Sequence, residues 1–176
     1  MIVVEFFDKN AIENMLSAML CQPEKVLFVG NSKKQMDTKL EVYREVLKTR
    51  CLENVVLDSI GLDQNNLAHI IEVLSGIVEQ TDLCVFNLDG GEDLYLVAVG
   101  AVAERYGSRV QMHRFNVRNN TIVDCDADGN DQLAMPIRIS IEENVRIYGG
   151  RVIFEDERRG TTPRWVMNEE FCQDIR

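Results

Sequence analysis

The sequence is short of the residues that build zinc sites and disulfide frameworks. Its five cysteines include no pair at CxxC spacing, and its two histidines, His69 and His113, are far apart. A zinc site is therefore disfavoured, and we expect reduced thiols. Cys84 lies inside an apolar run and is predicted to be a small core residue. His113 has no nucleophile beside it in the sequence, so we interpret it as a structural or surface residue.

Long hydrophobic runs are also absent. No stretch approaches the roughly 20 apolar residues that a membrane span requires. The first residues, MIVVEFFDKN, lack a basic region and include Glu5 and Asp8, unlike a signal peptide. We expect a cytoplasmic protein that does not associate with membranes.

Positive charge is scarce. Lys and Arg total 19 against 29 Asp and Glu, which gives a formal net charge of −10. Binding of long duplex nucleic acid through a basic face is therefore disfavoured. A small anionic ligand would need cations that gather locally.

The motifs of common catalysts are missing as well. There is no GxGxxG, no GxxxxGK[ST] and no GxSxG, so we expect no cofactor and assign no catalytic residue. The acidic segment 126–131 resembles part of a calcium loop, but it lacks the closing glutamate and the flanking EF-hand helices. We interpret it as an acidic turn and expect no metal site.

The chain does contain a repeated pattern of strands and helices. At 176 residues, 45% of them hydrophobic, it suits one domain. Its strand-like runs are almost continuously apolar, as in strands covered on both faces, and they alternate with helices. This predicts an α/β fold with a doubly wound, mainly parallel sheet flanked by helices. The expected strands are residues 2–7, 25–29, 54–58 and 83–87, and the expected helices are 12–20, 36–47, 67–78 and 94–106.

Beyond residue 107 the pattern changes. Residues 110–116 and 121–124 flank a turn and predict a C-terminal β-hairpin. Ser140 and Glu143 form a capping-box pattern that opens a short helix. Residues 151–155 are predicted as a strand, and the segment with Trp165 and Phe171 as a polar helix. We expect residues 1–150 to form the domain, and 151–176 to be a linker or the start of a truncated downstream domain.

The helix at 94–106 is apolar on nearly all sides until Glu104. A helix in the outer layer of an α/β domain normally keeps one wet face. It must therefore be buried within the domain or against another subunit, and we favour a homodimer interface.

Three loops follow predicted strands at the sheet edge where α/β proteins bind ligands. They are residues 8–10, 30–34 and 87–93. In the second loop, Gly30, Ser32 and the two lysines after it could cradle an anion. Ser32 with Gln35 also fits an ordinary capping box beside solvated lysines, and both interpretations stay open.

The third of these loops contains Gly90 and Gly91 between a buried strand and a buried helix. Paired glycines there indicate a close backbone approach or a positive φ. An alternative interpretation is local: Asp89 caps the helix and Glu92 completes a capping box. That alternative does not exclude a nearby ligand.

The segments KVLFVGNSKKQM, followed by Tyr43, and LCVFNLDGGEDLYLVAVGAVAERYG resemble the CRISPR-associated Rossmann-fold (CARF) domains. The resemblance covers residues 1–150. It is strongest to the branch in which this domain precedes a winged helix and a PD-(D/E)xK-type nuclease, so the chain looks like the N-terminal part alone. It implies a Rossmann-like homodimer that binds cyclic oligoadenylate, a second messenger of type III CRISPR immunity, across its two-fold axis. In the family such binding regulates an attached nuclease, and nuclease activity is expected only in a longer protein.

The resemblance also implies which residues bind the ligand, by matching position in the three loops. The matched residues are Asp8, Lys9, Asn10, Gly30, Asn31, Ser32, Lys33, Asn87, Leu88, Asp89, Gly90, Gly91, Glu92 and Asp93.

Asp89 departs from the family, which often has threonine or serine just before the two glycines. Two unit charges about 4 Å apart repel by about 1 kcal/mol in water and about 4 kcal/mol near a protein surface. A helix amino end returns only about 0.3–1 kcal/mol to an anion. Asp89 must therefore cap the helix and turn away, or accept from a ribose hydroxyl or adenine amino group.

Two alternative functions stay open at this point. One is a ring nuclease that cleaves its own ligand, with Ser32, Lys33 or Asn10 assisting. The other is a dimerisation module without a ligand, which Asp89 would suit.

Overall fold

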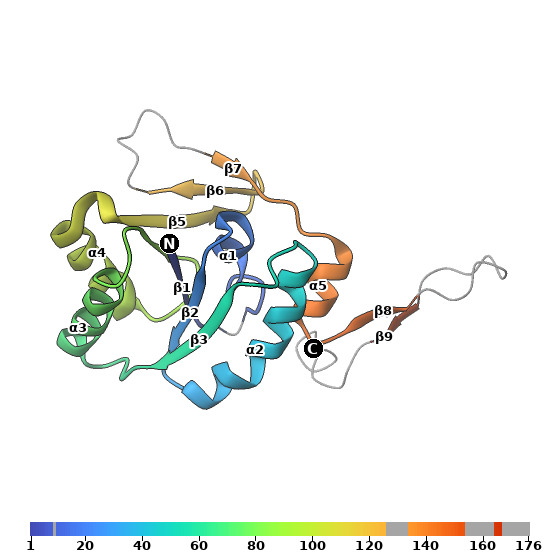
Figure 1. Ribbon diagram of the computed structural model, residues 1–176, viewed down its shortest axis with the longest axis horizontal. Coiled ribbons are helices and arrows are strands. Elements are labelled where there is room, and N and C mark those ends of the chain that lie inside the picture. The colour runs from blue at the N-terminus through green and yellow to red at the C-terminus, as the bar shows by residue number, and fades with distance from the viewer. Residues whose placement is uncertain (9, 126–133, 154–163, 167–176) are drawn as a thin grey trace.

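The computed structural model describes residues 1–8, 10–125, 134–153 and 164–166 (Figure 1). Its main sheet has seven strands in the order β3-β2-β1-β4-β5-β6-β7. The strands are β1 (Ile2–Phe6), β2 (Lys25–Gly30), β3 (Val56–Gly61), β4 (Cys84–Asn87), β5 (Val110–Asn116), β6 (Thr121–Asp124) and β7 (Ala134–Pro136), with β8 (Arg151–Ile153) and β9 (Arg164–Val166) in a separate pair. The helices are α1 (Leu16–Cys21), α2 (Lys33–Lys48), α3 (Leu67–Val78), α4 (Asp93–Tyr106), α5 (Ile141–Ile147) and the 3-10 turn η1 (Gly107–Arg109).

Strands β1 to β5 are parallel, and β6 and β7 run antiparallel beside them. The chain winds outward from β1 through β2 to β3, then crosses to β4 on the other side of β1. The strand order therefore reverses at β1 and β4, and this switch point is where open α/β sheets bind ligands. The predicted doubly wound fold and the β5–β6 hairpin are confirmed.

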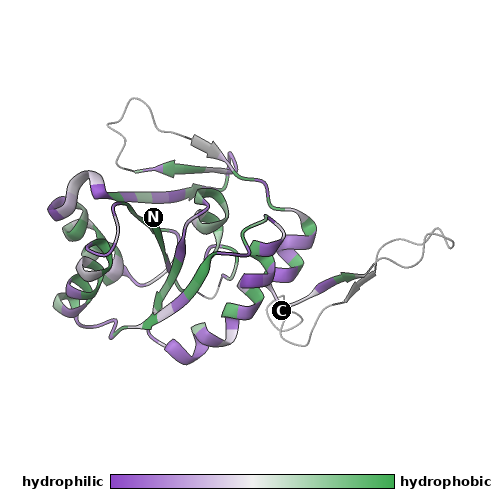
Figure 2. Ribbon diagram, in the orientation of Figure 1, coloured by the Kyte–Doolittle hydropathy of each residue, from purple (hydrophilic) through white to green (hydrophobic). Residues whose placement is uncertain are grey.

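Helices cover both faces of the sheet (Figure 1). One core cluster joins the sheet to α3 and α4, and the other joins it to α1, α2 and α5. Successive residues of β1 face opposite sides, so Val4 and Phe6 join the first cluster while Val3 joins the second. Figure 2 shows apolar residues along the central strands and hydrophilic residues on the outer sides of the helices.

Several predicted boundaries are wrong. The first helix begins at Leu16, because residues 11–15 form turns, and the third strand is Val56–Gly61. That strand lies at the sheet edge and its burial alternates, so it carries less of the apolar signal than the central strands. Trp165 lies in strand β9, paired with Val152 of β8, and not in a helix. Phe171 and the acidic segment 126–131 lie outside the described residues.

The predicted capping box of α5 is confirmed. The Ser140 hydroxyl accepts from the Glu143 N–H at 3.1 Å, and the Glu143 carboxylate accepts from the Ser140 N–H at 2.7 Å. Arg50, just beyond α2, donates to the same carboxylate at 2.6 Å. These bonds lower the pKa of Glu143 against the effect of its burial and fix α5 on α2.

Candidate ligand-binding site

The three predicted loops meet at the end of β1. A Cβ placed on Gly90 would lie 3.2 Å from the Asp8 Cβ, and one on Gly30 would lie 3.1 Å from the Phe7 Cβ. The loop after β4 therefore packs against one side of the β1 loop, and the loop after β2 against the other. The structure thus brings together Asp8, Gly30 and the Asn87–Gly91 segment.

The two glycines of the β4 loop are required by this packing. A Cβ on Gly90 would lie 2.3 Å from the carbonyl oxygen of Phe6, which is backbone. Gly91 has a φ of +92°, and its Cβ would meet the Phe6 Cβ at 2.7 Å. Both sequence expectations, close approach and positive φ, are confirmed. The backbone that Gly90 approaches is this chain's own β1.

Asp89 neither caps α4 nor belongs to a capping box. Its carboxylate accepts from the Phe115 N–H of β5 through both oxygens, at 2.8 and 2.9 Å. Glu92 occupies the N-cap position of α4 without a side-chain cap, so that prediction is wrong in both parts. Burial raises the pKa of Asp89, and the Phe115 N–H opposes the shift. The side chain therefore turns away toward β5, but without capping the helix as that alternative predicted.

The β1 loop is held by reciprocal hydrogen bonds. The Asp8 N–H donates to the Asn14 Oδ1 at 2.8 Å, and the Asn14 Nδ2 donates to the Asp8 carbonyl at 2.9 Å. Asn10 donates to the Glu13 carboxylate at 2.6 Å and accepts from the Tyr148 hydroxyl at 3.1 Å. Lys9 lies outside the described residues.

The β2 loop faces the neighbouring edge strand. Asn31 donates to the Gln64 Oε1 at 2.9 Å, and the Ser32 hydroxyl accepts a long bond of 3.4 Å from the Gln35 N–H. Lys33 Nζ lies 2.8 Å from the carbonyl and 2.9 Å from the hydroxyl of Ser59. The ammonium is therefore bound to β3, whereas the solvated-lysine interpretation left it free.

The other predicted residues lie at the mouth of the β4 loop. Leu88 is half-buried and packs on the core, and its N–H donates to the His113 carbonyl at 2.8 Å. Glu92 and Asp93 are exposed where α4 begins. The structure does not bring these two carboxylates into the packed junction of the loops.

A buried acid beneath the loops was missed. Glu5 is 0% exposed in the middle of β1. Its Oε1 accepts from the Ala18 N–H at 2.9 Å, and its Oε2 accepts from the Asn87 Nδ2 at 2.6 Å. Asn87 also donates to the Glu13 carbonyl at 2.7 Å and accepts from the Asp89 N–H at 3.1 Å. Glu5 thus supports the first residue of the β4 loop from below.

Burial dominates the chemistry of Glu5 and raises its pKa to about 8, although the bonds from Asn87 and Ala18 favour the charged form. The sequence did carry a signal, because Glu5 is an isolated acid inside the apolar run IVVEFF. An acidic side chain that points from a central strand into the protein core must accept hydrogen bonds there or remain protonated.

The cavities lined by described residues include two that lie beside the sheet. One, of about 640 Å³, lies between the end of α4 and β5 and includes Glu104 and Asp124 in its lining. The other, of about 560 Å³, lies on the β5–β6 hairpin and includes Arg114, Phe115 and Arg118. The hairpin cavity adjoins the β4 loop, because Phe115 is the residue that holds Asp89. In the described part of the chain, no group of three or more His, Cys, Asp or Glu side chains is placed to hold a metal ion.

No family model and no curated protein matches the sequence. Solved structures do match the fold. Can2 from Sulfobacillus thermosulfidooxidans, determined in complex with cyclic tetra-adenylate, aligns with a TM-score of 0.68 and 11% identity over 90% of this chain and 44% of that chain. Protein VC1899 from Vibrio cholerae aligns with a TM-score of 0.68 and 17% identity, covering 89% and 41%. A type III CRISPR defence DNA nuclease activated by cyclic oligoadenylate aligns with a TM-score of 0.64 and 13% identity, covering 89% and 24%.

At these identities the likeness shows the fold alone. The chain shares the Rossmann-like α/β fold of these proteins, and it spans less than half the length of each of them. The fold places ligand sites at the switch point, but the binding chemistry depends on this chain's own side chains.

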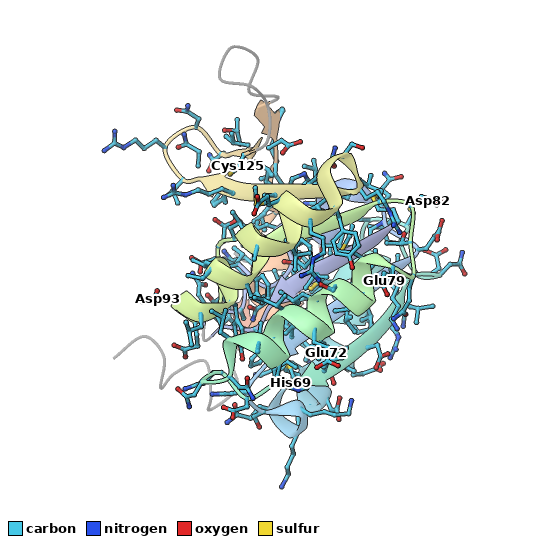
Figure 3. All side chains as sticks on the ribbon, turned by 90° about the vertical axis from the view of Figure 1, so that its left-hand side faces the viewer. His69, Glu72, Glu79, Asp82, Asp93 and Cys125 are labelled. Carbon is cyan, nitrogen blue, oxygen red and sulfur yellow. The ribbon has the colours of Figure 1, made fainter. Side chains whose placement is uncertain are left out.

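Helix α4 borders the candidate site and turns one apolar side outward. Tyr95, Ala98, Val99 and Val102 are buried, whereas Leu96 is 39% and Val97 54% exposed. Figure 3 faces this side of the molecule and shows α3 and α4 next to each other, with Asp93 where α4 begins. Of the two predicted ways to bury this helix, burial within the domain is therefore wrong. Over the residues that the structure describes, no helix is both long and apolar enough for a membrane span.

Proposed function

We propose that this chain is a sensor domain that binds cyclic oligoadenylate at the loops after β1, β2 and β4. In this proposal the ligand lies across the two-fold axis of a homodimer and regulates a nuclease that is not part of this chain. One observation carries the proposal. The three loops converge at the switch point of a fold that aligns over 90% of its length with a protein solved with cyclic tetra-adenylate.

The side chains of the junction suit nucleoside recognition. Asn31 is exposed beside Gly30, and its amide can donate to or accept from a base or ribose. Asp89 is held against β5, so its carboxylate does not project from the loop toward a phosphate. This geometry keeps the carboxylate away from a phosphate seated on the loop itself, and on the side of β5 the positive charge of Arg114 opposes that of Asp89.

Calorimetry with cyclic tetra- and hexa-adenylate tests the binding. We expect binding at micromolar concentrations of at least one ring. Asn31→Ala should weaken it about tenfold, which corresponds to one lost hydrogen bond of about 1.4 kcal/mol.

Gln64→Ala is the matched control, because it removes the same Asn31–Gln64 bond and leaves Asn31 in place. It should change the affinity less than twofold. Equal losses in the two variants would show that the hydrogen bond, and not contact between Asn31 and the ligand, affects binding. No heat with either ring would contradict the proposal itself.

The homodimer is proposed to form through the exposed side of α4. Val97→Glu would place a charge in the centre of that apolar surface, and burying an unpaired charge costs several kcal/mol. We expect the dimer to dissociate to monomers at micromolar concentration, measured by size-exclusion chromatography with light scattering.

Val56→Glu is the control for this change. Val56 is 56% exposed, close to the 54% of Val97, but it lies on edge strand β3. That variant should remain dimeric. A Val97→Glu protein that is still a dimer would place the subunit contact elsewhere.

A further inference from the structure

Among the described residues of the three loops, acids outnumber cations. Asp8, Asp89, Glu92 and Asp93 are acidic, Lys34 is an exposed cation, and the ammonium of Lys33 is bound by Ser59. The whole chain carries a net charge of −10. A ligand with several phosphodiester groups needs opposite charge close to each of them, because exposed charges are screened beyond about 8–10 Å. The loops alone therefore suit the nucleosides of such a ligand better than its phosphates.

The hairpin of β5 and β6 provides positive charge beside the three loops. Arg114 and Arg118 are exposed and contribute to the lining of its cavity of about 560 Å³. The arginines that form ion pairs within the described residues are Arg44, Arg50 and Arg146. No acid of the described residues forms an ion pair with either guanidinium group of the hairpin, although the carboxylate of Asp89 interacts electrostatically with Arg114. Asn116 adds an amide to the same lining.

Strand β5, which lines part of the cavity, is joined to the β4 loop by three hydrogen bonds. Both Asp89 oxygens accept from the N–H of Phe115, and the Leu88 N–H donates to the His113 carbonyl at 2.8 Å. Phe115 lies next to Arg114 and also contributes to the cavity lining. A ligand seated on the β4 loop therefore has the arginine cavity beside it, along β5.

We infer that the hairpin cavity binds a phosphate group of the ligand, with Arg114 and Arg118 as its cations. The inference rests on the proposed function and extends that site from the loops to the hairpin. A guanidinium group presents parallel N–H donors that match two phosphate oxygens, and such charge-assisted bonds are roughly twice as strong as neutral ones. Asp89 contributes by its turn toward Phe115, which fixes the loop to the hairpin.

The test compares binding of the cyclic oligoadenylate to four proteins by calorimetry at two salt concentrations. They are the unmodified chain, Arg114→Ala with Arg118→Ala, Arg114→Lys with Arg118→Lys, and Arg44→Ala with Lys48→Ala. The last pair removes two positive charges from α2, where both side chains pair with glutamates of their own helix. It therefore changes net charge as the alanine pair on the hairpin does.

We expect the alanine pair on the hairpin to lose at least tenfold in affinity and to show a shallower salt dependence. The lysine pair should regain part of the loss, because it keeps the charges without the bidentate geometry, and the α2 pair should stay within twofold. Unchanged melting temperatures would show that all variants are folded. Binding by the unmodified chain with no loss in the hairpin variants would overturn the inference and leave the proposed function intact. No binding by the unmodified chain would overturn both.

Discussion

Replacing Gly90 with alanine is expected to destabilise the fold by about 3 kcal/mol, at the upper end of what overpacking costs. The new Cβ would lie 2.3 Å from the carbonyl oxygen of Phe6, and real contacts of this kind stay beyond 3.0 Å. Phe6 belongs to β1, which is hydrogen-bonded to β2 on one side and β4 on the other. The strand cannot move aside without disturbing the centre of the sheet, so the loop itself must shift.

Urea denaturation of the Gly90→Ala variant and of the unmodified protein measures this loss of stability. Gly76→Ala is the matched control, because Gly76 lies in the last turn of α3 and a Cβ there would meet nothing within 4 Å. That variant should gain up to about 1 kcal/mol, since alanine favours the helix and restricts the unfolded chain. Equal stability of Gly90→Ala and the unmodified protein would mean that the β4 loop does not pack on β1 as described.

The sequence could predict that this loop has an unusual backbone conformation, but not which neighbouring segment requires it. Two glycines between a buried strand and a buried helix indicate a close approach, whether of a ligand or of the chain itself. Which of the two applies depends on the neighbour of β4 in the sheet. That neighbour is β1, more than 80 residues away in sequence, with Phe6 beside Gly90.

The same limit explains Asp89. Local pattern favoured a helix cap, because the acid stands a few residues before α4. Strand β5 extends past the end of β4, so the Phe115 N–H has no partner in β4 and donates to Asp89 instead. Only the tertiary fold reveals this competing donor. By contrast, the mainly parallel sheet and the helices on both of its faces followed from apolar runs that are buried on both faces, such as β1 and β4.

Boundaries were predicted well where local chemistry decides them. The capping box at Ser140 depends on residues within one turn. The start of α1 is not set by such local contacts. The helical spacing of apolar residues that includes Met15 and Leu16 begins within residues 11–15, which form turns over the core. Their burial, at 0% exposure each, satisfies the stripe without requiring a longer helix.

The second large effect concerns Glu5 and pH. Its pKa is about 8 in the folded protein, against 4.5 for an ordinary glutamate. Between these values the unfolded chain releases the proton and the folded chain keeps it, so stability contributed by this residue falls as pH rises. One pKa unit corresponds to 1.36 kcal/mol, so the loss amounts to about 5 kcal/mol by pH 8. Below pH 4.5 and above pH 8 the residue adds no further dependence.

Glu5→Gln removes this titration and should therefore abolish the fall. The amide oxygen of glutamine can accept from the Ala18 N–H, but its NH₂ group would then face the Asn87 Nδ2, which is also a donor. An unsatisfied buried donor costs about 1–3 kcal/mol. We expect the variant to be less stable than the unmodified protein at pH 5 and more stable at pH 8.

Denaturation curves at pH 5, 6, 7 and 8 measure the difference in the free energy of unfolding between the two proteins. Taking the difference cancels groups common to both, such as His113, whose pKa is lowered by burial and whose contribution to stability rises with pH. Glu53→Gln, at an exposed glutamate between α2 and β3, is the control and should leave the curves parallel. A constant difference for Glu5→Gln across this range would mean that Glu5 is ionised in the folded state. The Asn87 and Ala18 donors would then outweigh burial, and the β4 loop would rest on a charged carboxylate.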